Sequence, residues 1–252
     1  MNQARNLQQK KFLKKSKGYS LKSRLSPTQR LGLAKKIRSA RRYDRNRRYN
    51  VSRYLSGYEH VLLFNIPKKV EEIFKRKGSA VSLLDIGTGN KNAMNELAQK
   101  VGKNIDISTI GVSLLQSEKN NIRQMIRAFE NAKIQKKFDL IVSVGGTPYL
   151  TVFPFVVQKI CNLLTVGGEA RISINPKKIA IAAAVEKELK KQGLFANIEV
   201  RTYLEETSEE YDSAVMIIKR LNKKPANLES LIKQELQKPI TDNIEATRME
   251  LG

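Results

Sequence analysis

The sequence is poor in cysteine and histidine and has no long apolar run, and each scarcity excludes a kind of protein. Cys161 is the only cysteine among 252 residues, so no internal disulfide can form and nothing indicates an oxidising compartment. One cysteine and one histidine offer no Cys/His cluster for zinc, and we expect no metal site. No apolar run reaches the roughly 18 residues of a membrane span, and the basic N-terminus lacks the apolar core of a secretory signal. We therefore expect a soluble, cytoplasmic protein. The absence of any acid before Asp44 would also suit an organelle transit peptide, so an organelle matrix is the alternative location.

Acidic residues are scarce in the first third of the chain. Residues 1–80 hold 23 of the 47 lysines and arginines but only 4 of the 24 acids, whereas residues 81–252 are nearly balanced. Such a block of positive charge typically binds a polyanion, most often nucleic acid. Tyrosines are interleaved with the arginines, and because arginine contacts phosphates while tyrosine stacks on bases, the combination favours RNA. The residues that we expect to contact RNA are Arg41, Arg42, Arg45, Arg47, Arg48, Tyr49 and Arg53. The competing interpretation is a cationic tail that raises solubility or carries a targeting address.

Short apolar runs alternate with helix-compatible segments from Ala80 onward, which is typical of a parallel sheet. The expected strands are Val81–Asp85, Ile105–Val112, Met125–Phe129, Phe138–Val144, Ala170–Ile174, Ile198–Tyr203 and Ala214–Lys219. The expected helices between them are Asn92–Val101, Leu114–Arg123, Phe153–Leu164 and Lys177–Gln192. Apolar positions at helical spacing over residues 51–77 predict leading helices that pack on this domain.

The chain divides into three parts on this pattern. Residues 1–50 form a basic N-terminal arm that is partly helix-compatible, and residues 51–222 form an α/β domain with its leading helices. Residues 223–252 form a C-terminal appendage, in which Pro225 and Pro239 flank a possible helix over Leu228–Leu236.

A glycine-containing turn follows the first expected strand. Leu83-Leu84-Asp85-Ile86-Gly87-Thr88-Gly89-Asn90 runs from an apolar strand through an acid into a glycine-x-glycine turn, and a helix is expected to follow. Glycines at such a turn let the backbone approach a ligand closely, with the helix N-terminus facing it. The segment resembles the first motif of class I S-adenosylmethionine-dependent methyltransferases, and the likeness extends over roughly Val61–Leu221. The resemblance implies a Rossmann-like seven-stranded, mostly parallel sheet with an antiparallel last strand, helices on both faces, and S-adenosyl-L-methionine as cofactor.

The resemblance assigns the first cofactor-binding residues to the glycine turn. In the family, the glycine backbone passes under the methionine part of the cofactor, and the acid fixes the loop or the cofactor's ammonium group. This implies cofactor contacts at Asp85, Gly87 and Gly89. Lys91 stands in the place of the family's third glycine, where it would either pair with the cofactor carboxylate or point to solvent.

A second landmark is the end of the second strand, where the family usually has an acid that binds the ribose hydroxyls. The segment Gly111-Val112-Ser113-Leu114 aligns best there because a helix-like run follows directly, which places Ser113 at the acid's position. The competing alignment uses Asp106, but it leaves too few residues after the first helix for a full strand. We prefer Ser113, and we expect its single hydroxyl to hold a diol more weakly than a carboxylate does.

Two further landmarks follow. Asn131-Ala132 matches the family's acid and small residue, whose side chain and following amide bind adenine, and Asn131 keeps an acceptor without the charge. Phe138–Ser143 matches the fourth strand, and the loop after it faces the methyl group in the family. Methyl transfer needs mainly alignment of the acceptor and sometimes a base. The candidate catalytic residues are therefore Ser143, Thr147 and Tyr149, although Tyr149 would equally serve only to shape the loop.

Together these features favour a methyltransferase acting on RNA, with ribosomal RNA as one candidate. One alternative is a methyltransferase of a protein or small molecule whose arm serves targeting. Another is a non-catalytic RNA- or ribosome-binding protein on a degenerate methyltransferase fold, because two cofactor positions that are usually acidic are neutral here. A nicotinamide dehydrogenase is the remaining rival, since Asp106 lies about 20 residues after the glycines, but its third glycine would stand at Asn92.

Overall fold

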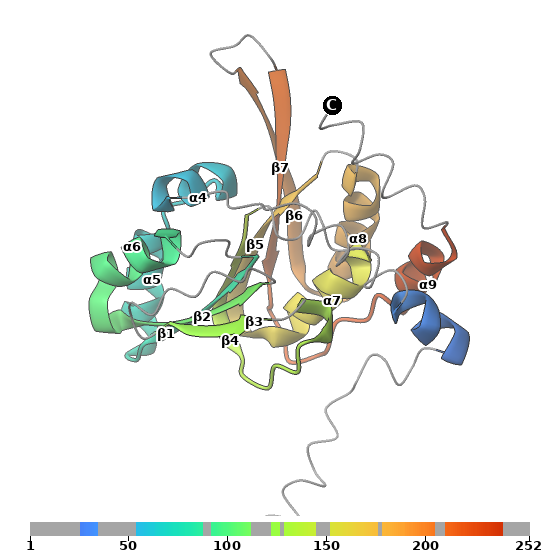
Figure 1. Ribbon diagram of the computed structural model, residues 1–252, viewed down its shortest axis with the longest axis horizontal. Helices are drawn as coiled ribbons and strands as arrows, with labels where there is room; N and C mark the ends of the chain where they lie inside the picture. Colours follow the sequence, from blue (N-terminus) through green and yellow to red (C-terminus); the bar gives the residue numbers. More distant parts are fainter. Residues whose placement is uncertain are drawn as a thin grey trace, which may run out of the picture.

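The computed structural model describes residues 26–34, 54–87, 92–111, 122–126, 129–144, 152–175, 178–204 and 210–238. These residues form one twisted sheet covered by helices (Figure 1). The strands are β1 (Val81–Ile86), β2 (Ile105–Gly111), β3 (Arg123–Ile126), β4 (Phe138–Ser143), β5 (Leu164–Ile174), β6 (Phe195–Leu204) and β7 (Glu210–Lys219). The helices are α4 (Leu55–Leu62), α5 (Ile66–Lys77), α6 (Asn92–Val101), α7 (Phe153–Leu163), α8 (Ile179–Lys191) and α9 (Glu229–Gln237), with short 3-10 turns η1 (Gly102–Asn104) and η2 (Phe129–Asn131).

The strand order is β3-β2-β1-β4-β5-β7-β6. Strands β1 to β5 pair in parallel, whereas β7 lies antiparallel between β5 and β6. The predicted mostly parallel α/β sheet with an antiparallel last strand is therefore confirmed. The order changes direction between β1 and β4, and such switch points are where open α/β sheets bind ligands, beyond the carboxyl ends of the strands.

Two apolar clusters fill the two faces of this sheet. Helices α4, α5 and α6 pack with one side of β1, β2 and β4, where Tyr58, Met94 and Leu140 are buried. Helices α7, α8 and α9 pack on the opposite face, where Phe153, Val185 and Ile172 are buried. All six residues of β1 are buried, as expected of a central strand covered on both sides.

Helix α5 shows why these local sequences fold as they do. The side chain of Asn65 accepts a hydrogen bond from the Lys68 amide at 2.8 Å, which caps the helix N-terminus, and proline follows in the first turn. Gly78 ends the helix with a φ of 70°, a backbone conformation that glycine adopts without strain.

Strand β5 is longer than its predicted bounds of Ala170–Ile174. The pair Gly167-Gly168 resembles a turn before the strand, yet both glycines lie inside β5 at a point where its register with β4 shifts. The Gly167 amide donates to the Arg220 carbonyl at 2.7 Å. A Cβ on Gly168 would lie 2.9 Å from Thr165 Oγ1 and 3.1 Å from the Phe138 carbonyl oxygen. The glycines thus permit a bulge and a close backbone approach instead of a turn.

Strand β3 is the second difference from the predicted elements. It begins at Arg123 and ends at Ile126, and Phe129 belongs to η2 instead of the strand. The expected helix Leu114–Arg123 therefore cannot include Arg123, and most of its remaining residues lie outside the described part of the chain.

Short segments near both ends of the chain pack on the domain. Residues 27–34 form a helix within the expected arm, and Leu33 from it is only 1% exposed, in the same cluster as Leu228 and Ile232 near α9. Part of the arm and part of the appendage are therefore built onto the α/β domain. None of the helices in the described residues has both the length and the apolarity that crossing a membrane requires.

Candidate functional site

The carboxyl ends of the central parallel strands meet at one edge of the sheet. Strand register places Asp85 of β1 opposite Thr109 of β2 on one side and Val142 of β4 on the other. The segment after β1 thus leaves the sheet at the switch point. This is the position that the sequence predicts for the glycine turn.

Gly87 is the first residue of that turn. Its φ is 83°, which disfavours any other residue, and its amide donates to the carbonyl of Ile110 at the end of β2 at 2.7 Å. The backbone therefore turns sharply above β2. The predicted contacts Gly89 and Lys91 lie outside the described residues.

The Asp85 carboxylate is buried beneath this turn. The Tyr58 hydroxyl of α4, itself buried, lies 3.1 Å from Asp85 Oδ2 and 3.3 Å from Oδ1. A hydrogen bond to a buried carboxylate offsets part of its desolvation cost. Asp85 thus anchors α4 to the end of β1. The apolar spacing identified Tyr58 as core-facing, but its charged partner stands 27 positions later, and nothing in the sequence indicated that pairing.

Helix α4 also contacts the far side of the glycine turn. The Leu55 amide, at the start of α4, donates to Glu96 Oε2 of α6 at 2.9 Å. Asp85 precedes the turn and α6 follows it, so α4 bridges both flanks of residues 87–91. No local pattern around Glu96 indicates this contact, because its partner Leu55 lies 41 positions earlier in the chain.

The acid of the competing alignment lies far from this edge. Asp106 is opposite Ser82 at the start of β2, and its carboxylate pairs with Lys136 Nζ at 2.7 Å. It cannot reach a ribose held at the carboxyl ends of the strands. This excludes the Asp106 alignment and removes the acid on which the dehydrogenase alternative depended. Strand β2 ends at Gly111, and Ser113, two positions further, lies outside the described residues.

The predicted adenine-facing residues lie on η2 and directly after it. Asn131 is the last residue of η2 and is half-buried, and Ala132 is buried. The Ala132 amide, which the resemblance assigns to the adenine ring, already donates to the Phe129 carbonyl at 3.2 Å. Adenine would therefore have to share this donor or displace the turn's own bond.

Lys159 of α7 holds that turn in place. Its ammonium donates to the Phe129 carbonyl and to the Ala132 carbonyl, the latter at 2.7 Å, and it lies 4.5 Å from the centre of the Phe129 ring. Hydrogen bonds from a charged donor are stronger than neutral ones. Sequence reasoning missed Lys159, because a lysine on a helix gives no sign of its partner in a distant turn.

Ser143 is the one candidate catalytic residue within the described part of the chain. It is fully buried at the end of β4, and its hydroxyl donates to the Ile86 carbonyl at 2.8 Å. This bond ties β4 to β1 beside the glycine turn. Thr147, Tyr149 and all seven expected RNA contacts lie outside the described residues.

Several other buried ionisable groups lie away from this edge. Burial alone would raise the pKa of Asp139, at the start of β4, but hydrogen bonds from Lys77, Ser82 and Thr165 outweigh it and hold the pKa below the usual carboxyl range. Burial likewise opposes ionisation of Glu169, yet Arg171 and Lys69 lower its pKa. Burial raises the pKa of the Cys161 thiol to about 12, so Cys161 is a protonated packing residue.

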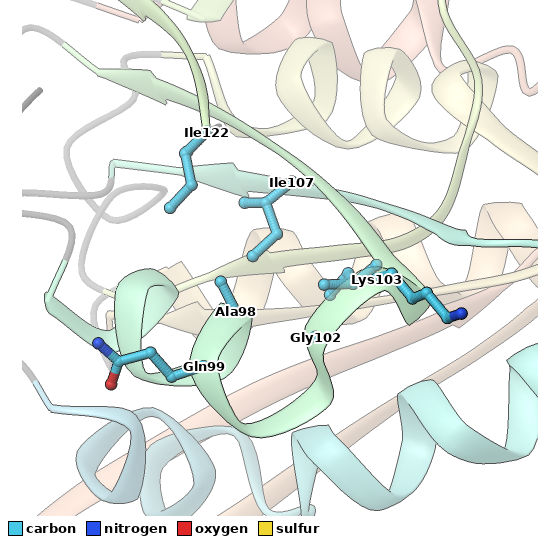
Figure 2. Close-up of a pocket in the computed structure, with 7 residues that line it drawn as sticks. Ala98, Gln99, Gly102, Lys103, Ile107 and Ile122 are labelled. Carbon is cyan, nitrogen blue, oxygen red and sulfur yellow. The ribbon is translucent and has the colours of Figure 1, made fainter. Parts of the chain in front are cut away.

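A cleft of about 420 Å³ lies beside α6, at the start of β2. Ala98, Ile107 and Ile122 face into it, whereas Gln99 and Lys103 extend outward at its rim (Figure 2). Because it is next to η1 and not beyond Gly111, it is distinct from the glycine turn. Within the described residues, no three His, Cys, Asp or Glu side chains gather as a metal site.

The strand order β3-β2-β1-β4-β5-β7-β6, with β7 antiparallel and the turn at Gly87 at the switch point, is that of a Rossmann-like α/β fold. No protein-family model and no curated protein matches the sequence. Several solved methyltransferases are similar in structure. The match with 1,6-didemethyltoxoflavin-N1-methyltransferase of Burkholderia thailandensis, solved with 1,6-didemethyltoxoflavin and S-adenosylhomocysteine, covers 74% of this chain and 89% of that one, with 11% identity and a TM-score of 0.49.

Two further matches have similar extents. The N-methyltransferase NodS of Bradyrhizobium japonicum, in complex with S-adenosylhomocysteine, is 12% identical over 62% of this chain and 86% of that one, with a TM-score of 0.43. Precorrin-6y C5,15-methyltransferase of Geobacter metallireducens is 10% identical over 62% and 87%, with a TM-score of 0.42. The likeness concerns the fold, and the two substrates named among these proteins, 1,6-didemethyltoxoflavin and precorrin-6y, differ from each other.

Proposed function

We propose that this chain is an S-adenosylmethionine-dependent methyltransferase whose substrate is RNA. The observation that carries the proposal is the turn at Gly87, which has a positive φ, leaves the sheet at its switch point and stands between a buried acid and helix α6. A backbone turn of this kind accommodates a ligand pressed closely against it.

The described residues fit the glycine-loop half of such a site better than the adenine half. Gly87 would pass under the methionine part of the cofactor, with Asp85 holding the loop from below. Asn131 would accept from the adenine amino group, and Ser113 would face the ribose. The bound cofactor supplies a methyl group already activated on a sulfonium, so the protein's task is to orient the acceptor and to exclude water.

The RNA half of the proposal depends on charge. The excess of lysine and arginine in residues 1–80, with tyrosines among the arginines, suits phosphate contacts combined with base stacking. Residues 81–252 are nearly balanced, so the first 80 residues, and the arm above all, are the main source of long-range attraction for a polyanion.

A non-catalytic RNA-binding protein on this fold is the second candidate function. Two groups that a working site would use, the Ala132 amide and the Ser143 hydroxyl, are already hydrogen-bonded within the protein. A degenerate site has no need to keep such groups available.

Calorimetric titration of the full chain with S-adenosylmethionine and S-adenosylhomocysteine separates the two candidates. We expect binding of both at micromolar concentration. Absence of binding at millimolar cofactor would support the non-catalytic function. Transfer of labelled methyl groups into ribosomal RNA, with ribosomal proteins as the parallel acceptor, then tests the substrate class.

A further inference from the structure

Cations gather at the edge of the sheet opposite the glycine turn, where the parallel strands begin. Lys77, at the end of α5, pairs with Asp139 at the start of β4 at 2.6 Å. Lys136, just before β4, pairs with Asp106 at the start of β2. These contacts place the C-terminus of α5 and the loop before β4 along one edge, which we call the amino edge.

The same edge continues across α7, β7 and α8. Lys137 donates to the Asn162 carbonyl at the end of α7. Arg220, directly after β7, donates to the carbonyls of Leu164 and Lys223, each at 2.9 Å.

A last contact extends the edge to the end of α8. Asn222 donates to the Gly193 carbonyl at 3.1 Å, and Gly193 follows Lys190 and Lys191. With neighbouring strands about 4.8 Å apart, the seven-stranded edge is about 30 Å wide.

Six further cations at this edge are exposed and have no ion-pair partner among the described residues. They are Lys75, Arg76, Lys100, Lys103, Lys223 and Lys224. The two carboxylates that begin β2 and β4, by contrast, are each paired with a lysine. The amino edge therefore carries uncompensated positive charge, part of it from the basic first 80 residues (Lys75 and Arg76) and part from the nearly balanced residues 81–252.

Helix dipoles account for only part of this pattern. Lysines are favoured in the last turn of a helix, and those of α5, α6 and α8 stand there. Lys103, Lys136, Lys223 and Lys224 lie outside the α-helices, at the same edge, where no α-helix end requires them.

Exposed apolar side chains lie among the cations at the β5, β6 and β7 end. Phe195 begins β6 and is 40% exposed, with Lys219 Nζ at 5.1 Å from its ring centre. Val166 and Leu221 are also exposed near this point. An exposed aromatic ring among lysines is the arrangement that single-stranded bases stack on.

From these contacts we infer that the amino edge is a second RNA-binding surface, formed by the folded domain itself and separate from the N-terminal arm. Lysines along the edge contact phosphates, and Phe195 stacks on an unpaired base. The inference rests on the RNA half of the proposed function but not on cofactor binding. An acidic protein is the less favoured partner, because protein interfaces are depleted in lysine and this edge is rich in it.

The amino edge and the glycine turn lie at opposite ends of the strands, so the RNA held here is not the segment that accepts the methyl group. The substrate must be large enough to reach both ends, which favours a structured RNA over a short single strand.

The test compares two double variants of the full chain that lose the same charge. Lys75→Gln with Lys103→Gln neutralises the amino edge. Lys68→Gln with Lys187→Gln neutralises exposed lysines in the first turn of α5 and on the outer side of α8. Binding of a fluorescein-labelled RNA hairpin with a stem of about 16 base pairs and an unpaired loop is measured across a salt series.

We expect the amino-edge variant to bind more weakly and its logarithmic salt slope to fall by about 1.5, since each lost phosphate contact removes about 0.7 to 0.9. The control variant keeps the wild-type slope. Phe195→Ala is expected to weaken binding roughly tenfold with little change in slope.

Each outcome has a definite meaning. Equal slopes for both double variants, together with unchanged binding by Phe195→Ala, overturn the amino-edge surface and leave the arm as the RNA contact. No RNA binding by the wild type overturns the RNA half of the proposed function as well. If the amino-edge variant loses binding to a labelled polyglutamate probe while its RNA binding is unchanged, the surface belongs to an acidic protein and the inference is overturned.

Discussion

At the scale of single residues, the most demanding position is Gly87. Its positive φ and its amide bond to Ile110 fix a conformation that glycine alone adopts easily. The loop's function, if it holds a cofactor, depends on the lack of a side chain there.

Replacing Gly87 with leucine is therefore expected to abolish S-adenosylmethionine binding in calorimetry, while the circular dichroism spectrum stays that of the folded wild type. Gly78→Leu is the matched control, because Gly78 also has a positive φ but stands in an open turn, where a Cβ would meet no atom within 4 Å. Micromolar binding that survives Gly87→Leu would remove the basis of the site assignment.

Tyr58 is the second residue with a distinct expectation. Tyr58→Phe removes one hydrogen-bond donor from a fully buried carboxylate, which is expected to lower the free energy of unfolding by about 1–3 kcal/mol. Chemical denaturation measures the loss, and Tyr54→Phe, at an exposed tyrosine, serves as the control. A stability equal to that of the wild type would show that Asp85 does not depend on α4.

At the scale of elements, the turn η2 depends on a side chain from another helix. Lys159→Met keeps most of the apolar stem but loses both hydrogen bonds to carbonyls at this turn. We expect cofactor affinity to weaken by about 1–2 kcal/mol, because the segment proposed to face adenine loses its support. Calorimetry on this variant and on Lys187→Met, an exposed lysine of α8, gives the comparison. Identical affinities would mean that η2 holds its shape unaided.

The start of β4 gives a prediction on pH. Because the pKa of Asp139 is lowered in the fold, its contribution is present above the ordinary value of 3.8 and is lost as the pH falls through the lowered pKa. Asp139→Asn is expected to cost about 2 kcal/mol near neutral pH, and the gap to the wild type should close in acid. Asp106→Asn, which breaks an exposed pair, should cost under about 1 kcal/mol throughout. A gap that stays constant into acid would contradict the role of the Asp139 charge.

The sequence predicted most elements because apolar runs and helical spacing are local signals. It misplaced the start of β5, since Gly167-Gly168 has the composition of a turn and only the packed neighbours reveal a bulge. It placed Asp85 and Gly87 at the turn that ends β1, where the structure has them, and their contact with a cofactor stays a prediction. It did not identify Lys159 or Glu96, whose partners are distant in sequence and carry no local pattern.

At the scale of the whole molecule, the arm and the domain are not independent. Leu33 is buried against the domain, so deleting residues 1–48 would expose apolar surface as well as remove charge. A charge substitution in the full chain is the cleaner experiment.

The test changes five arginines of the arm to glutamine: Arg41, Arg42, Arg45, Arg47 and Arg48. The slope of log affinity for RNA against log salt is expected to fall by up to about 3.5, or about 0.7 for each lost phosphate contact. Affinity for S-adenosylmethionine should stay at the wild-type value. An unchanged salt slope would show that the arm does not touch RNA, and it would then be better explained as a targeting or protein-docking element.

The bridge that α4 makes over the glycine turn couples two events that are separate in sequence. The Tyr58 hydroxyl is hydrogen-bonded to Asp85 before the turn, and the Leu55 amide to Glu96 after it. Local opening of α4 therefore breaks both hydrogen bonds. A ligand that requires an ordered turn will therefore oppose that opening, and by reciprocity a docked α4 raises the affinity for the ligand. Amide hydrogen exchange in α4 should slow when S-adenosylhomocysteine binds, although no α4 residue needs to touch it. The exchange rate of α4, the first helix after the arm, would then report whether the cofactor is bound.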